Sequence, residues 1–330
     1  MEKAPASKAM GFAGLITAMV VGSLMSPTFK TALKLGITPV GVALWRMVFT
    51  VALLLVVCRL KKSLWSDVCK VAKDKKLFWT VIAMGVTRGF ETICWSMSLS
   101  MSGTFVVNIL GNITPIFTII LLYVLYREKT SLPALFGIGI SLIGVVLIGL
   151  NGSATGGASL VSIIIMPLSS LSYGIFLLLG RDVTRQISVI PLMLYVFATS
   201  MVMVLCFGTV SGISMALPAP TLPYVLVIAL FCTVLSQTIS SWCMRTIKPT
   251  TISVVYLFSP VVSAFTAFVL IGETVAPSIL LGGGVVLLGL FVYLMATERG
   301  RKPRAVQPEP RPEALEAVNV SDRQPQVAEK

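Results

Sequence analysis

Ten long apolar runs constrain this sequence more than any other feature. A helix that crosses the hydrocarbon core of a bilayer needs about 20 predominantly apolar residues. The strands of a membrane barrel would be about half as long and would alternate strictly. The sequence therefore predicts an all-α integral membrane protein with ten transmembrane helices. The predicted spans are residues 9–29, 39–58, 78–99, 104–126, 132–150, 160–180, 189–210, 223–244, 249–272 and 276–295.

The composition leaves too little polar material for a wetted surface. Of the 330 residues, 56% are apolar and 12% are charged, whereas a soluble domain carries about 45–50% apolar and about 25% charged residues. Histidine is absent, and the six cysteines form no CxxC pair. Because histidine is the commonest metal ligand and the usual general base, we expect no metal and no cofactor.

The basic residues indicate topology rather than nucleic-acid binding. The net charge is +13, but the charges lie between the apolar runs and near the C-terminus, with no basic face interleaved with aromatic residues. Loops rich in Lys and Arg remain in the cytoplasm. With a cytoplasmic N-terminus, only Lys30 and Lys34 fall on the outer side. We therefore expect a multi-pass protein of the cell (inner) membrane, with both termini cytoplasmic and with the lipid bilayer, not nucleic acid, as its surroundings.

An internal repeat divides the membrane part into two halves, residues 9–150 and 158–297. Because the repeat is five spans long and five is odd, the second half enters the membrane inverted, an arrangement typical of secondary transporters. Residues 1–8 are predicted to be a short cytoplasmic N-terminus, and the polar, Pro-rich residues 298–330 a disordered cytoplasmic tail. A shift of 145 residues aligns Pro115 with Pro260, Glu128 with Glu273, Gly137 with Gly282, Gly139 with Gly284 and Gly144 with Gly289.

Three motifs of the sequence are similar to those of a known family. The first is the segment 39–46, which ends at Arg46. The second runs from Pro115 through Glu128 into a Gly-rich helix, and the third is its second copy, from Ser259-Pro260 through Gly272-Glu273 to Gly289. In these motifs, and over residues 9–297, the chain resembles the EamA branch of the drug/metabolite transporter superfamily. The resemblance implies a ten-span inverted-repeat fold with a central cavity. It also implies export of amino acids, related metabolites or toxic organic compounds.

Three ionisable residues, Arg46, Arg88 and Glu91, lie deep within predicted spans. A charge there costs at least about 2.5–3.5 kcal/mol on insertion scales, so such residues usually face a cavity or a partner. Arg88 and Glu91 share one helix face. In one interpretation Arg88 holds a substrate carboxylate, while Glu91 meets an amine or takes a coupling proton. In the other, the two residues neutralise each other and stabilise the bundle. Arg46 is predicted to act in coupling or gating, or else to be architectural.

Other polar and helix-breaking residues fall at the same depth in the membrane. Hydrogen-bonding groups that converge on a midplane cavity between two repeats would suit a polar ligand. The alternatives are that a serine bonds its own helix backbone and that the two prolines are kinks needed for packing. Besides Arg88 and Glu91, the predicted substrate-binding residues are Trp95, Asn108, Asn112, Pro115, Gln237, Tyr256, Ser259 and Pro260.

The other repeated residues are predicted to be structural. Glu128 and Glu273 each end one span and precede a proline at the start of the next, where a carboxylate meets the positive end of the following helix. Gly137 and Gly282 let helix backbones approach closely, either between protomers or within one. They permit a homodimer without requiring one.

These features favour a secondary transporter that moves a small polar or charged organic metabolite, such as an amino acid, by alternating access around a midplane cavity. The alternative is a membrane-embedded enzyme that acts on a lipid or lipid-linked substrate. Such an enzyme needs a catalytic constellation, and the sequence has no histidine and no HExxH motif. We therefore expect a small-molecule substrate and no enzymatic activity. No Walker A motif is present, so ATP does not drive the chain directly.

Overall fold

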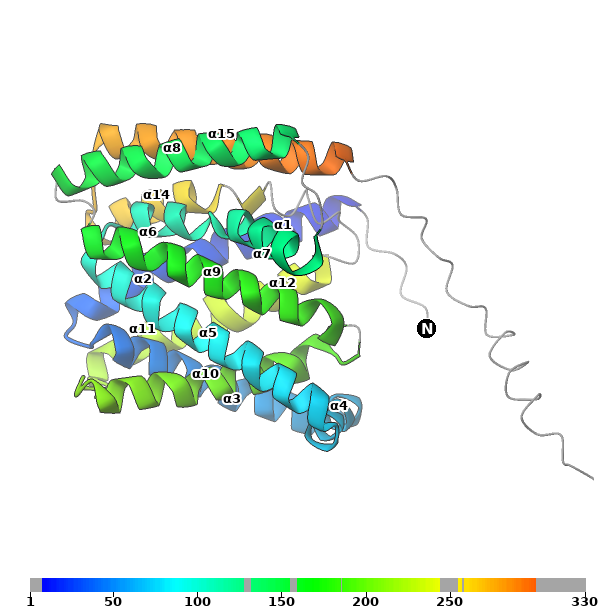
Figure 1. The fold of residues 1–330 in the computed structure, drawn as a ribbon. Helices are drawn as coiled ribbons and strands as arrows, with labels where there is room; N and C mark the ends of the chain where they lie inside the picture. Colours follow the sequence, from blue (N-terminus) through cyan, green and yellow to red (C-terminus); the bar gives the residue numbers. More distant parts are fainter. Residues whose placement is uncertain are drawn as a thin grey trace, which may run out of the picture.

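The computed structural model describes residues 8–127, 132–154, 159–184, 186–243, 255–256 and 258–300, and the regular structure within them is helical (Figure 1). The helices are α1 (Lys8–Ser23), α2 (Met25–Lys34), α3 (Pro39–Leu60), α4 (Lys62–Lys73), α5 (Lys75–Met101), α6 (Thr104–Gly111), α7 (Thr114–Tyr126), α8 (Leu132–Ala154), α9 (Leu160–Val183), α10 (Val189–Val210), the 3-10 helix η1 (Ala219–Thr221), α11 (Leu222–Val227), the π-helix η2 (Ile228–Leu235), α12 (Ser236–Cys243), α14 (Ser259–Ile271) and α15 (Pro277–Gly300).

Six stretches of these helices are long and apolar enough to cross a membrane, as expected of a multi-pass membrane protein. They are Gly11–Lys34, Pro39–Leu60, Leu160–Gly180, Val189–Val210, Ala219–Ile239 and Pro277–Ala296. The count of ten spans is not confirmed. The predicted span 78–99 lies in α5, which has 27 residues but carries Arg88 and Glu91. Three further apolar helices, Thr104–Thr118, Leu132–Ile148 and Ser259–Ile271, are shorter.

The predicted fourth span is broken near its middle. α6 ends and α7 begins on either side of Asn112, whose backbone N–H bonds back to the carbonyl oxygen of Asn108. Pro115 and Pro260 are each the second residue of a helix, α7 and α14 respectively. The prolines therefore begin helices instead of kinking continuous ones, because a proline in the first turn lacks only an N–H that the helix does not use.

Equivalent helices of the two repeats, α8 and α15, pack against each other along one edge of the molecule (Figure 1). A Cβ atom built on Gly137 would lie 2.6 Å from the carbonyl oxygen of Gly289, and one on Gly144 would lie 2.8 Å from that of Gly282. Because the lower-numbered glycine of α8 meets the higher-numbered glycine of α15, the two helices are antiparallel, as an inverted repeat requires. These glycines therefore bring helices together within one protomer.

The remaining helices bring segments of both halves around a common centre. α5 packs on α9 and α10, and α10 also packs on α3. α14, from the second half, packs on α1, α2 and α6 of the first half. The functional region described below lies where α14 meets these three helices.

We predict that Gly137→Ala destabilises the protein, because the added methyl group would overlap backbone atoms of α15. Overpacking of this kind costs about 1–3 kcal/mol. Gly139→Ala is the matched control, since a Cβ atom at Gly139 meets nothing within 4 Å and alanine favours a helix. Thermal unfolding of the detergent-solubilised protein measures both effects. Equal unfolding midpoints for the two variants would contradict the close contact between α8 and α15.

Candidate substrate cavity

A cavity of about 170 Å³ lies at the centre, between helices of the two repeats. α1, α2, α3, α5 and α6 of the first repeat and α14 of the second contribute to its wall. Its lining is polar on most sides and includes three charged groups. The lining residues are Gly22, Ser23, Met25, Ser26, Arg46, Arg88, Glu91, Thr92, Trp95, Asn108 and Ser259.

Arg88 and Glu91 form an ion pair on α5. The Arg88 Nη1 atom lies 2.9 Å from Glu91 Oε2, and each side chain is only 16% exposed. Glu91 also accepts a hydrogen bond of 3.3 Å from the Thr92 hydroxyl. On its other side, the Arg88 guanidinium lies 4.8 Å from the centre of the Tyr173 ring of α9, within the range of a cation–π contact. The charges of Arg88 and Glu91 therefore balance each other.

Arg46 reaches the same cavity from α3 and is in a different electrostatic situation. It is 4% exposed, and its Nη1 atom lies 3.6 Å from the sulfur of Met25, which is a weak acceptor. Its Nε atom is buried and has no hydrogen-bond partner. Among the residues that the structure describes, none forms an ion pair with Arg46. The guanidinium is therefore a buried cation that no carboxylate of these residues contacts directly.

Polar contacts join α14 to the first repeat beside the cavity. The Ser23 hydroxyl donates to the Ser259 hydroxyl at 3.0 Å. The Asn108 Nδ2 atom lies 3.0 Å from the hydroxyl oxygens of both Ser26 and Ser263. Ser23 belongs to α1, Ser26 to α2 and Asn108 to α6, whereas Ser259 and Ser263 both belong to α14. The two repeats are therefore held together here by hydrogen bonds between side chains.

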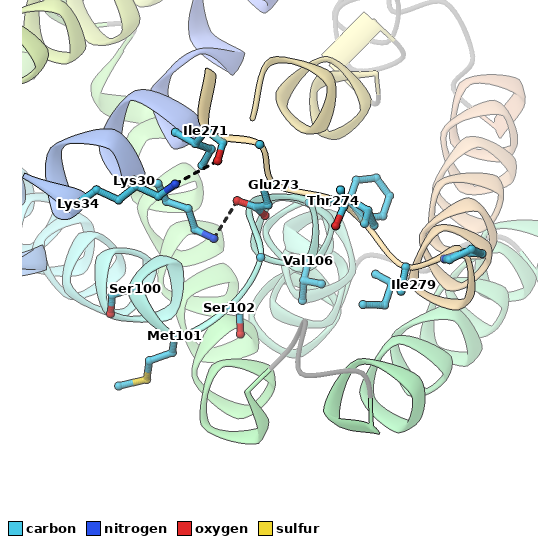
Figure 2. Close-up of a pocket in the computed structure, with 16 residues that line it drawn as sticks. Lys30, Lys34, Ser100, Met101, Ser102, Val106, Ile271, Glu273, Thr274 and Ile279 are labelled. Atoms are coloured by element: carbon cyan, nitrogen blue, oxygen red, sulfur yellow. Dashed lines mark hydrogen bonds and ion pairs between the residues drawn. The ribbon is translucent and has the colours of Figure 1, made fainter. Parts of the chain in front are cut away.

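A second, larger hollow of about 840 Å³ lies beyond these contacts, at the end of the molecule that carries Lys30 and Lys34 (Figure 2). Lys30 Nζ lies 3.0 Å from the Glu273 carboxylate, which also accepts a hydrogen bond of 2.8 Å from the Thr104 hydroxyl. The backbone N–H of Thr104 donates to the same carboxylate. Lys34 donates to the carbonyl oxygen of Ile271 at 3.1 Å.

The position of Glu273 corrects the sequence-based expectation. We expected its carboxylate to cap the following helix, which is α15. It instead meets the first turn of α6 in the other repeat, where free backbone N–H groups favour an anion. The α6 helix begins close by in space but 169 residues away in sequence, so spacing along the chain gave no sign of it. Glu128 lies outside the described residues.

The structure brings together six of the predicted site residues: Arg46, Arg88, Glu91, Trp95, Asn108 and Ser259 all line the cavity. Of the other five substrate-binding candidates, Asn112, Gln237, Tyr256 and Pro260 are not among the residues that line it, and the side chain of Pro115 lies outside the described part of the chain. Asn112 caps the end of α6, Pro115 and Pro260 begin helices, Gln237 lies on an exposed face of α12, and Tyr256 packs beside Leu15.

Sequence reasoning missed the contribution of the first span to this region. Ser23 and Ser26 line the cavity, and Lys30 lies in the outer hollow. The three residues are spaced three and four apart, which places them along one helix face. These polar residues on one face of an otherwise apolar segment were the pattern from which the contribution of the first span could have been predicted.

The sequence profile of the EamA-like transporter family matches the chain twice, over residues 9–150 and 160–295. The chain belongs to this family. The resemblance seen in its motifs is thereby confirmed, and a family of transporters fits the expectation that the chain is not an enzyme. A comparison of this EamA-family protein with curated proteins found no match. A solved structure titled "Crystal structure of protein" is 13% identical, covers 88% of this chain and 99% of its own length, and has a TM-score of 0.59, which shows a shared fold.

We predict that Arg88 and Glu91 depend strongly on each other for stability. Arg88→Gln or Glu91→Gln alone leaves one buried charge without its partner, whereas the double variant removes both charges. The loss of unfolding free energy in the double variant should therefore be smaller than the sum of the single losses, by about 0.5–3 kcal/mol. Denaturation of the purified protein measures all three variants. Additive losses would show that the ion pair contributes nothing of its own.

Proposed function

We propose that this EamA-family protein is a secondary transporter that carries a small polar or charged organic metabolite by alternating access, through ten spans in two inverted repeats. Export is the direction that the family resemblance implies. One observation carries the proposal: the polar cavity lies between the repeats, and polar contacts from one repeat to the other lie at one of its ends. Among the described residues, no observation favours a lipid-modifying enzyme.

The bridging contacts are Ser23–Ser259, Asn108–Ser263 and the contacts of Glu273 with Lys30 and Thr104. They follow one another from the cavity toward the outer hollow. Ser259 and Ser263 are four residues apart on α14, and Thr104 and Asn108 are four apart on α6, so each step is about one helical turn. The bridging contacts therefore separate the cavity from the outer hollow.

These contacts have the properties that a reversible gate requires. Each joins a first-repeat group to a second-repeat group, and each can be exchanged for hydrogen bonds to water when α14 moves away from α1, α2 and α6. A hydrogen bond contributes only about 0.5–1.5 kcal/mol net. Lys30 and Lys34, which line the outer hollow, are on the predicted outer side of the membrane. We therefore assign the state described here as closed to the outside.

Metabolite profiling identifies the substrate. Culture medium and cell extracts are compared between cells that express the chain and cells that carry an empty vector. We expect one class of small polar metabolite to build up in the medium of the expressing cells and to fall inside them. Purified protein in liposomes would then carry the same compound in a direct flux measurement. Liposome flux equal to that of protein-free liposomes, for every compound found, would overturn the proposed function.

We predict that a cross-link between Ser23 and Ser259 stops transport. Their hydroxyl oxygens are 3.0 Å apart, so Ser23→Cys with Ser259→Cys, in a chain whose natural cysteines are replaced, should form a disulfide on oxidation. The oxidised double variant should retain less than about a tenth of the liposome flux, because alternating access requires this contact to open. Reduction should restore the flux.

The two single-cysteine variants, oxidised in the same way, are the controls for this experiment. Oxidation should leave the flux of each single variant the same as in its reduced form, because neither can form the cross-link. Full flux through a double variant whose cross-link is complete by mass spectrometry would rule out opening at this end of the cavity.

We predict that Glu273→Gln opens the outer end more often. The change keeps the shape of the side chain but removes the charge that holds Lys30 and favours the first turn of α6. A cysteine placed at Thr92, which is 1% exposed and lines the cavity, should then react several-fold faster with a membrane-impermeant thiol reagent added outside. A cysteine at Leu35, which is already 40% exposed, should react at an unchanged rate. An unchanged rate at Thr92→Cys would exclude Glu273 from the gate.

A further inference from the structure

The charges that line the cavity do not sum to zero. Among the described residues, the wall carries two guanidinium groups and one carboxylate, from Arg46, Arg88 and Glu91. The carboxylate is already in a short ion pair with Arg88. The excess positive charge therefore belongs to Arg46, which is 4% exposed and has no ion-pair partner among the described residues.

A buried cation without a counter-charge is unfavourable, so its presence at a cavity points to a ligand. Arg46 also has a buried Nε atom that lacks an acceptor, and among the described residues its hydrogen-bond contact is the thioether of Met25. The guanidinium is a rigid fork of N–H donors that matches a carboxylate through two parallel hydrogen bonds. The partner that the Arg46 guanidinium lacks is therefore a planar anion.

We propose that Arg46, rather than Arg88, binds the negatively charged group of the substrate, and that the substrate is a small monocarboxylate. This inference rests on the proposed function and names the substrate class of the same cavity. One negative charge balances the wall. A zwitterion leaves the excess positive charge in place, because its amine finds Glu91 already paired with Arg88.

The rest of the wall agrees with a small carboxylate that has a short polar or apolar body. Ser26, Asn108 and Ser259 offer neutral hydrogen-bonding groups, and Trp95 offers an aromatic surface. The cavity volume of about 170 Å³ is close to the roughly 150 Å³ of a cavity that holds benzene. A carboxylate of that size fits, whereas a large drug-like molecule does not.

The test measures binding, independently of transport, on the full chain purified in detergent. Acetate, lactate, butyrate and benzoate are the probes, and the corresponding amides and amines are their neutral and cationic counterparts. Each is titrated while the unfolding temperature is recorded, because a ligand that binds the folded state raises that temperature with concentration. We expect at least one carboxylate, and neither its amide nor its amine, to stabilise the protein.

The variants place the binding at Arg46. Arg46→Gln should weaken carboxylate binding at least tenfold, while the unfolding temperature without ligand stays the same or rises, because an uncompensated buried charge is removed. Arg46→Lys keeps the charge without the fork and should bind several-fold more weakly than the natural chain. Arg59→Gln is the matched control, since Arg59 lies on the same helix but outside the cavity, over the Trp65 ring.

Several results would overturn the proposal. One is unchanged carboxylate binding in a folded Arg46→Gln protein, and another is loss of binding in the Arg88→Gln/Glu91→Gln double variant, which keeps the net charge of the wall. Equal stabilisation by the amides would also overturn it, as would full competition by chloride at the same concentration, which marks a site for any inorganic anion. If Arg46→Gln does not fold, Arg46→Lys tests the proposal instead, because its carboxylate binding should be several-fold weaker than that of the natural chain. A chain that binds carboxylates but carries none across liposomes would refute the proposed function only. A chain that carries a non-carboxylate would refute this inference only.

Discussion

A charge inside a bilayer needs a partner or a polar cavity, and this requirement determines what surrounds the centre of the protein. Arg88 and Glu91 satisfy each other on α5, and the Tyr173 ring of α9 lies against the same guanidinium. Arg46 enters from α3, and in the described part of the chain the acceptor that it meets is the thioether of Met25. Serine and asparagine side chains of α1, α2, α6 and α14 gather at the same place. The helices of the bundle are therefore arranged around one polar volume in an otherwise apolar interior.

Two of the contacts between the repeats differ in how easily they open. Between α8 and α15, glycines bring backbone against backbone, so that a single methyl group would overlap the facing chain. Close-packed surfaces of this kind do not deform continuously. Between α14 and the first repeat, by contrast, side chains meet through hydrogen bonds and one ion pair. Water can replace these groups one at a time. The glycine contact suits a permanent attachment of the repeats, and the polar contacts suit a movable one.

Local sequence patterns predicted the parts of this arrangement that depend on one segment or on the repeat. Apolar runs indicated the six spans that are long enough to cross a membrane, the 145-residue shift identified α8 and α15 as equivalent helices, and three-residue spacing placed Arg88 and Glu91 on one helix face. The predictions that failed concern contacts between segments that are distant in the sequence. Glu273 meets Thr104 of the other repeat, and Gln237 is exposed and is not among the residues that line the cavity. Depth in the membrane can be counted from sequence, but the direction of a side chain around its helix depends on which neighbour packs there.

The cavity and the bridging contacts share residues, and this overlap links ligand binding to opening. Ser23, Ser259 and Asn108 line the cavity and also make the innermost bridging contacts. A ligand that bonds to their polar groups competes with those contacts, so it binds the open arrangement better than the closed one, and only such a difference can shift an equilibrium. Reversing a 1:99 ratio of two states requires about 5.5 kcal/mol. Each hydrogen bond contributes about 0.5–1.5 kcal/mol net, so the exchange at Ser23, Ser259 and Asn108 supplies part of this difference. The hydrogen bonds that Arg46 would offer a carboxylate are available in either arrangement, so they strengthen binding without favouring one state.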